Sequence, residues 1–277
     1  MPRILQITDT HLSARNGGLF RDNIARIAEA VAATPPDLVM ATGDISLDGA
    51  DRDEDLDFAV AALRELPWPL MILPGNHDTG SHARFMPRQP VDDARMARWR
   101  RIAGPGRGVV DLEGWRAIGL NTEVMGTGHP EEAAQAAFIA EAAAGAGDRR
   151  IALFLHKPLS LTLPEDPAFD MWTVPPAGRP ALAPLLAHPG LRLVGSGHLH
   201  LHHEVTRGRV AWVWAPALSF VMEVAEQAGI PGARRCGALL HDLHEDHATT
   251  RLVAPAGVET VGFLSVRDRT YPPGATP

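Results

Sequence analysis

Short apolar runs separated by amphipathic segments make up most of the first two-thirds of the chain. Residues 4–7 form a mostly apolar run, whereas Phe20, Ile24, Ile27 and Val31 recur at the spacing of one helix face. The pattern predicts strands over 3–7, 37–42, 69–73, 109–112, 115–120, 150–155 and 191–194. It predicts helices over 20–33, 51–66, 92–102, 131–144 and 180–187. This alternation of strands and helices favours an α/β fold with a largely parallel sheet.

The later part of the chain has a different pattern. Residues 201–266, apart from a looser stretch at 223–235, alternate between apolar and polar positions and predict β-hairpins in a second, more antiparallel sheet. The proline-containing segment 159–179 is expected to be a surface loop of the kind that serves as an active-site lid. We expect a single domain over residues 1–266 and a flexible tail over 267–277.

The composition is that of a globular protein, with 277 residues of which 45% are hydrophobic and 21% charged. The net charge of -7 provides no basic surface for a nucleic-acid polymer, which is therefore not expected as a partner. No apolar run approaches the length of a membrane span, and the first strand leaves no room for a signal peptide. Because Cys236 is the only cysteine, no disulfide can form within the chain, and a cytoplasmic location is expected.

Side chains of metal-ligand type follow five of the apolar runs. They are Asp9 and His11, Asp44, Asn76 with His77, His156, and His198 with His200. The carboxyl ends of strands in an open α/β sheet form one crevice, so these groups should converge. Apart from His77 they make seven ligands, too many for one tetrahedral ion but suitable for two ions that share a carboxylate. Nitrogen and oxygen ligands without thiolate favour manganese, iron, zinc or cobalt.

In their order along the chain, these residues resemble the motifs of the calcineurin-like metallophosphoesterases. The matching stretches are Asp9-x-His11, Gly43-Asp44, Gly75-Asn76-His77-Asp78, His156-x-Pro158 and Gly197-His198-x-His200. Each motif is weak alone, because turn residues are common at strand ends, but together the five extend from residue 9 to residue 200. The resemblance implies an α/β fold in which two mixed sheets form a β-sandwich flanked by helices.

The resemblance also implies a role for each matching residue. One divalent ion would be held by Asp9, His11 and His200, and the other by Asn76, His156 and His198. Asp44 would bridge the two ions, and His77 would protonate the leaving oxygen as general acid, supported from behind by Asp78. We expect manganese or iron first, with zinc or cobalt as alternatives. A metal-bound hydroxide, formed because the ion lowers the pKa of water to roughly 7, would be the nucleophile.

Within the family, the chain is similar to the class III cyclic-nucleotide phosphodiesterase branch, which also includes glycerophosphodiesterases and implies a homodimer. The chain departs from this branch at two places. Leu120-Asn121-Thr122-Glu123 stands where Leu-Asp-Ser is more usual, and Lys157 follows His156 where the branch has His-Pro-Pro. The expected substrate is a small phosphodiester, either a 3′,5′-cyclic nucleotide or a glycerophosphodiester, and no membrane is expected as a partner.

Other functions remain open at this point. A phosphomonoesterase or a nucleotide pyrophosphatase would use the same motifs. A non-catalytic interaction module on this fold is a further alternative, against which the complete set of ligand positions argues.

Two further groups of residues have more than one interpretation. The first group, which suits loop packing and a base-stacking lid equally, is Phe169, Met171 and Trp172. The second group looks like a metal site and consists of His241, His244 and His247. For this second group we favour a polar hairpin turn between apolar strands at 237–240 and 249–253.

Overall fold

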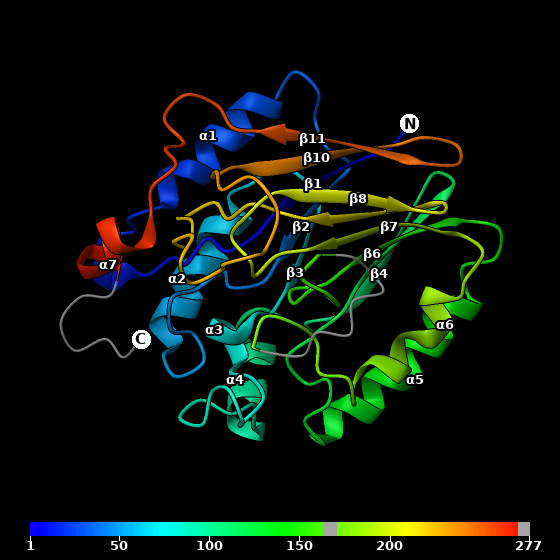
Figure 1. The fold of residues 1–277 in the computed structure, drawn as a ribbon, viewed down its shortest axis with the longest axis horizontal. Helices are drawn as coiled ribbons and strands as arrows, with labels where there is room; N and C mark the ends of the chain where they lie inside the picture. The colour runs from blue at the N-terminus through cyan, green and yellow to red at the C-terminus, as the bar shows by residue number, and fades with distance from the viewer. Residues whose placement is uncertain (163–170, 271–277) are drawn as a thin grey trace.

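A computed structural model describes residues 1–162 and 171–270, and its strands form two sheets (Figure 1). The first sheet has the order β11-β10-β1-β2-β3, with β1 at Arg3–Ile7, β2 at Leu38–Thr42, β3 at Leu70–Leu73, β10 at Ala238–Leu243 and β11 at Ala248–Val253. The second has the order β4-β5-β6-β7-β9-β8, with β4 at Gly108–Leu112, β5 at Trp115–Gly119, β6 at Arg150–Phe154, β7 at Leu191–Ser196, β8 at His203–Arg207 and β9 at Val210–Trp214. Both sheets contain parallel and antiparallel pairs, so the expected mixed β-sandwich is confirmed.

Helices flank the two sheets (Figure 1). The longer ones are α1 at Arg21–Val31, α2 at Asp53–Arg64, α4 at Asp93–Ile102, α5 at Pro130–Ala144 and α7 at Phe263–Thr270. The shorter ones are η1 at Ala14–Asn16, α3 at Asn76–Thr79, η2 at Arg179–Leu182 and α6 at Ala183–Leu186. Helices α1 and α2 pack on the first sheet, and α5 and α6 pack on the second. Among residues 1–162 and 171–270, no helix has both the length and the apolar character needed to cross a bilayer.

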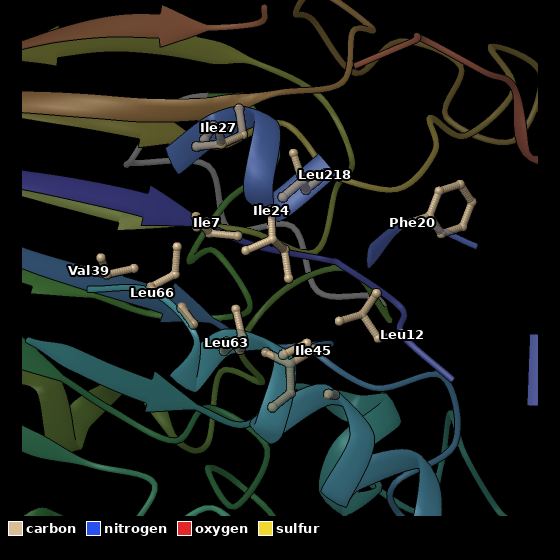
Figure 2. Close-up of a cluster of buried hydrophobic side chains, with 14 of the residues drawn as sticks. Ile7, Leu12, Phe20, Ile24, Ile27, Val39, Ile45, Leu63, Leu66 and Leu218 are labelled. Carbon is tan, nitrogen blue, oxygen red and sulfur yellow. The ribbon is translucent and has the colours of Figure 1, made fainter. Parts of the chain in front are cut away.

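The core consists of apolar layers because alternate residues of a strand face opposite sides of its sheet. Ile4 and Met40 face the second sheet and pack in one layer with Phe154. Ile7 faces outward and packs with Ile27 of α1, in the layer that Figure 2 shows. A third layer lies between the second sheet and α5. Strands that are buried on both faces in this way end in a protected interior, where polar groups can be held firmly.

The late hairpins differ from expectation, because they do not form a sheet of their own. The hairpin β8–β9 pairs with β7, and the hairpin β10–β11 pairs with β1. The parallel strands are divided as well, with β1 to β3 in one sheet and β5 to β7 in the other. Strands β1 and β7 are buried and need a hydrogen-bonding neighbour on each side. The strands β2 and β6 supply one neighbour, and the hairpins supply the other.

Two further expectations need correction. Helix α7 occupies residues 263–270. The sequence predicts hairpins over 263–266 and a flexible tail from residue 267 onward. Val266 and Thr270 are buried, and their burial holds the helix in place. His241 lies inside β10 rather than in the turn, buried between the sheets with Nε2 3.1 Å from Gln6 Oε1. His244 and His247 do lie at the turn, with ring centroids 4.5 Å apart.

Candidate metal centre

The residues expected to bind metal lie together at the carboxyl ends of β1, β2, β3, β6 and β7. Three groups have ligand atoms within 4.8 Å of one another: Asp9 with His11 and His200, His11 with Asp44 and His77, and Asp44 with His156 and His198. Asn76 joins the third group, because its Oδ1 is 3.3 Å from His156 Nε2. All of the expected ligands are buried, whereas His77 is half-buried.

Asp44 lies between the two expected ligand sets. Its Oδ2 is 3.3 Å from His156 Nε2 and 4.0 Å from His11 Nε2. Its Oδ1 accepts a hydrogen bond of 2.8 Å from the backbone N–H of His77. One carboxylate therefore faces both sets while the neighbouring loop fixes its orientation.

The strand ends that carry the ligands have an unusual backbone conformation. The φ angles are positive at Asp9 (51°), His11 (44°), Asp44 (47°), His198 (70°) and His200 (52°), and no other non-glycine residue in the described ranges has a positive φ. A side chain with a Cβ avoids this region, at a cost of about 1–3 kcal/mol per residue. Strain that is confined to one cluster indicates that the surrounding fold holds these residues for a function.

Two motif glycines allow the strand ends to approach each other closely. A Cβ on Gly75 would lie 2.2 Å from Asp44 Oδ1 and 2.7 Å from His156 Nε2. A Cβ on Gly197 would lie 2.9 Å from Asp9 Oδ2. These separations are too short for carbon, so only glycine leaves room for the acidic side chains at their present positions.

Backbone carbonyls fix the direction in which two of the imidazoles face the centre. His156 Nδ1 donates to the carbonyl of Thr42 at 2.8 Å, and His200 Nδ1 donates to the carbonyl of Phe220 at 2.7 Å. Because a carbonyl can only accept, Nδ1 carries the proton in both rings. In the neutral ring, Nε2 therefore turns a lone pair toward the centre, as in a histidine that binds a metal.

Imidazole lone pairs and carboxylate oxygens face one another across short distances, an arrangement that a cation between them would stabilise. His200 Nε2 lies 3.3 Å from Asp9 Oδ1, an oxygen that has no hydrogen-bond partner within the described part of the chain although it is buried. His11 Nε2 and His200 Nε2 are only 3.2 Å apart. The residues present therefore fit divalent ions that take nitrogen and oxygen ligands, such as manganese, iron, zinc or cobalt.

The pKa shifts of these residues also indicate that the centre needs positive charge to balance its carboxylates. Burial would raise the pKa of Asp9, but the positive charge of the neighbouring His200 outweighs this effect and lowers the pKa to about 2. Burial would lower the pKa of His156, but Asp44 outweighs it and raises the pKa to about 10. Burial, with repulsion from His156, lowers the pKa of His198 well below its usual value. Without metal, protons on imidazole balance the carboxylates, and metal binding would release them.

The placement of His77 and Asp78 corrects the expectation that Asp78 supports His77 directly. His77 Nδ1 donates to the carbonyl of Leu47 at 2.9 Å, and its ring lines the cavity over the centre. Asp78 accepts hydrogen bonds of 2.9–3.1 Å from the backbone N–H groups of Ile45, Ser46 and Gly75. A buried carboxylate needs several donors, and these loops supply them. Asp78 therefore acts on the loop that carries Leu47, and Leu47 orients His77.

The cavity over the centre has a polar side and an apolar side. The polar side consists of His11, Asp44, Asn76, His77, His198 and His200. The apolar side consists of Met171, Trp172, Phe220, Met222 and Phe263. Met171 and Trp172 thus lie at the site, whereas Phe169 is outside the described residues.

Sequence reasoning missed the apolar residues Phe220, Met222 and Phe263. They fall in the stretch 201–266, for which the sequence predicts hairpins, and they show no strand or helix periodicity. The one available signal was the mostly apolar run 217–222, which alternation does not explain.

The structure thus combines two mixed sheets with clusters of aspartate and histidine at the ends of their strands. The chain belongs to the calcineurin-like phosphoesterase family, whose model matches residues 2–202. The resemblance seen in the motifs is therefore confirmed, and the protein is a metal-dependent phosphoesterase.

Curated relatives are similar over much of the chain. The 3′,5′-cyclic adenosine monophosphate phosphodiesterase CpdA of Pseudomonas aeruginosa is 29% identical over 231 residues, which cover 77% of this chain and 75% of the relative. The enzyme of the same name from Escherichia coli K12 is 32% identical over 165 residues, covering 56% of this chain and 54% of the relative.

Solved structures share the fold at low identity. A dimetal phosphatase from Danio rerio has a TM-score of 0.56 and 14% identity, with 91% of this chain and 95% of that chain covered. A purple acid phosphatase from yellow lupin seeds has a TM-score of 0.62 and 16% identity, with 91% and 51% covered. At these identities the likeness establishes the fold alone.

Proposed function

We propose that the protein hydrolyses small phosphodiesters at a binuclear metal centre. The position of Asp44 between two buried ligand sets is the observation that carries the proposal. In this assignment Asp9, His11 and His200 hold one ion, and Asn76, His156 and His198 hold the other. Manganese or iron is proposed first, and zinc or cobalt are the alternatives.

When bound, the two ions supply positive charge for the phosphate anion and activate a water as the nucleophile. Asp44 stays in a fixed position between the two ligand sets, because its Oδ1 accepts a hydrogen bond from the backbone N–H of His77. His77 keeps Nδ1 on the carbonyl of Leu47, so its Nε2 is available to the cavity. As the P–O bond to the leaving group breaks, a proton on Nε2 moves to the departing oxygen, and the ring becomes neutral.

The candidate substrates and the alternative functions differ in how well the observations support them. The names of the relatives, which are 3′,5′-cyclic AMP phosphodiesterases, support a cyclic nucleotide as substrate. A glycerophosphodiester is the second class, and a phosphomonoesterase or nucleotide pyrophosphatase is the alternative within the family. A non-catalytic module is disfavoured because every ligand position is filled and buried.

The test compares substrates on manganese-loaded protein with about two ions per chain. The substrates are 3′,5′-cyclic AMP, glycerophosphocholine, bis(p-nitrophenyl) phosphate and the monoester p-nitrophenyl phosphate, with Asp44→Asn as the inactive reference. Faster cleavage of a natural diester than of the monoester supports the proposal. Cleavage of the monoester alone would favour a phosphomonoesterase, and a fully loaded protein without any hydrolysis would overturn the enzymatic proposal.

The proposal includes a cytoplasmic location and a homodimer. The location is supported by a single cysteine, Cys236, which is buried and free. Cell fractionation tests the location, and light scattering of the purified full chain tests the dimer.

A further inference from the structure

The apolar side of the cavity supports an inference about substrate class, and this inference rests on the proposed function. Phe220, Met222 and Phe263 line the cavity beside the ligand residues. All three follow residue 202, where the match to the family model ends. The family match therefore does not account for this part of the site.

The backbone fixes these residues firmly against one another. Val221 N donates to the carbonyl of Val261 at 2.9 Å, and Phe263 N donates to the carbonyl of Val221 at 2.9 Å. Glu223 Oε1 accepts a hydrogen bond of 3.2 Å from Leu264 N and so holds the first turn of α7. The start of α7 is therefore joined to the segment that carries Phe220 and Met222.

A series of rings leads from the expected metal ligands to Phe263. The ring centroid of Phe220 lies 4.8 Å from that of His200 and 5.0 Å from that of His11. The ring centroid of Phe220 also lies 5.1 Å from that of Phe263. Phe220 is buried, whereas Met222 and Phe263 are partly exposed. The cavity therefore has partly exposed apolar surface one ring away from the centre.

We propose that Met222 and Phe263 are specificity-determining residues that bind a flat ring on the substrate. The phosphate needs only the polar side, whereas apolar surface beside it gains free energy when a ring displaces water. The phenyl ring of Phe263 can stack on a heterocycle of the substrate, and the sulfur of Met222 can pack against the edge of that heterocycle. The substrate class is then a nucleotide diester rather than a glycerophosphodiester, because glycerol carries no ring.

The test measures binding of AMP and ribose 5-phosphate, which share the sugar and the phosphate and differ in the base. On manganese-loaded protein, calorimetry should show AMP binding about 10-fold more tightly. Phe263→Ala should remove most of this preference and leave ribose 5-phosphate binding unchanged, and Met222→Ala should remove part of it. Leu264→Ala is the matched control, because Leu264 is the next residue of α7 and is 60% exposed. It should keep the full preference.

Three outcomes would count against the inference, and they are distinguishable. Equal affinity of the two ligands in the unmodified protein would show that no ring is recognised. If Phe263→Ala weakened the binding of AMP and of ribose 5-phosphate equally, at an unchanged melting temperature, Phe263 would have a structural role only. If Phe263→Ala unfolds, Phe263→Leu keeps the packing and should still lose the preference. Failure of ribose 5-phosphate to bind protein that carries two ions would overturn the proposed centre, and the inference with it.

Discussion

The ammonium group of Lys157 lies 3.0 Å from the carboxylate of Glu123, inside the protein and one residue beyond His156. The two side chains are 5% and 0% exposed. Lys157 Nζ also donates to Ser81 Oγ at 2.6 Å, and Lys157 N donates to Thr122 Oγ1 at 3.1 Å. The pair therefore joins the loops that follow β3, β5 and β6. Lys157 and Glu123 lie at the two places where the motifs depart from the related branch, so the two departures are in direct contact.

Replacing Lys157 with methionine should lower the free energy of unfolding by about 3–5 kcal/mol, because Glu123 keeps a buried charge without a partner. The double variant Lys157→Met/Glu123→Gln should recover much of this loss. Chemical denaturation of the unmodified protein, both single variants and the double variant measures the coupling between the two residues.

The exposed pair Arg21 and Glu65, with side chains 45% and 63% exposed, provides the control. Arg21→Met should change the free energy of unfolding by less than about 1 kcal/mol. A similar small change for Lys157→Met would mean that the buried pair contributes little.

The expected metal ligands could be located from the sequence because strand periodicity and polar strand ends are local signals. Asp9 follows the apolar run 4–7, and Asp44 follows the run 38–42, so the crevice at the strand ends predicts that they meet. The sequence does not reveal that both residues adopt a positive φ. Aspartate has no intrinsic need for that conformation, and long-range packing imposes it.

Partners distant in the sequence could not be predicted in the same way. Lys157 and Glu123 are residue types that are usually exposed, and nothing local indicates that they are buried together. The hairpin β10–β11 was visible from its alternation, but alternation names no neighbouring strand, so its pairing with β1 was missed. The same limit explains Phe263, whose place at the cavity depends on a backbone contact with Val221.

Asp44→Asn should weaken the binding of both ions together, since the carboxylate faces both ligand sets. Elemental analysis after dialysis should find well under two ions per chain, and calorimetry with manganese should find both sites weakened. Asp246→Asn is the control, because Asp246 is 73% exposed at a hairpin turn, and it should retain both ions. One site left at full affinity in Asp44→Asn would refute the bridging assignment.

Asp78→Ala should lower the free energy of unfolding by about 3–5 kcal/mol, because three buried backbone N–H groups lose their acceptor. Asp78→Asn keeps one acceptor oxygen and should lose less. Urea denaturation of the metal-free proteins measures both changes. Asp37 is the matched control, because it is an exposed aspartate whose carboxylate accepts a hydrogen bond from only one backbone N–H, that of Arg3. A loss in Asp78→Ala no larger than in Asp37→Ala would exclude the loop-holding role.

His77→Ala should slow hydrolysis of a natural diester by about 10²–10⁴-fold while both ions stay bound, because the variant lacks the group that protonates the leaving oxygen. Bis(p-nitrophenyl) phosphate should lose far less activity, since p-nitrophenolate leaves without a proton. Measuring kcat for both substrates, with elemental analysis of the same samples, gives the comparison. His247→Ala, at a side chain 59% exposed, should change neither rate.

His77 lies within ligand distance of His11 and Asp44, so loss of an ion in His77→Ala would instead identify it as a ligand. Equal slowing of the two substrates would also rule out the general-acid role.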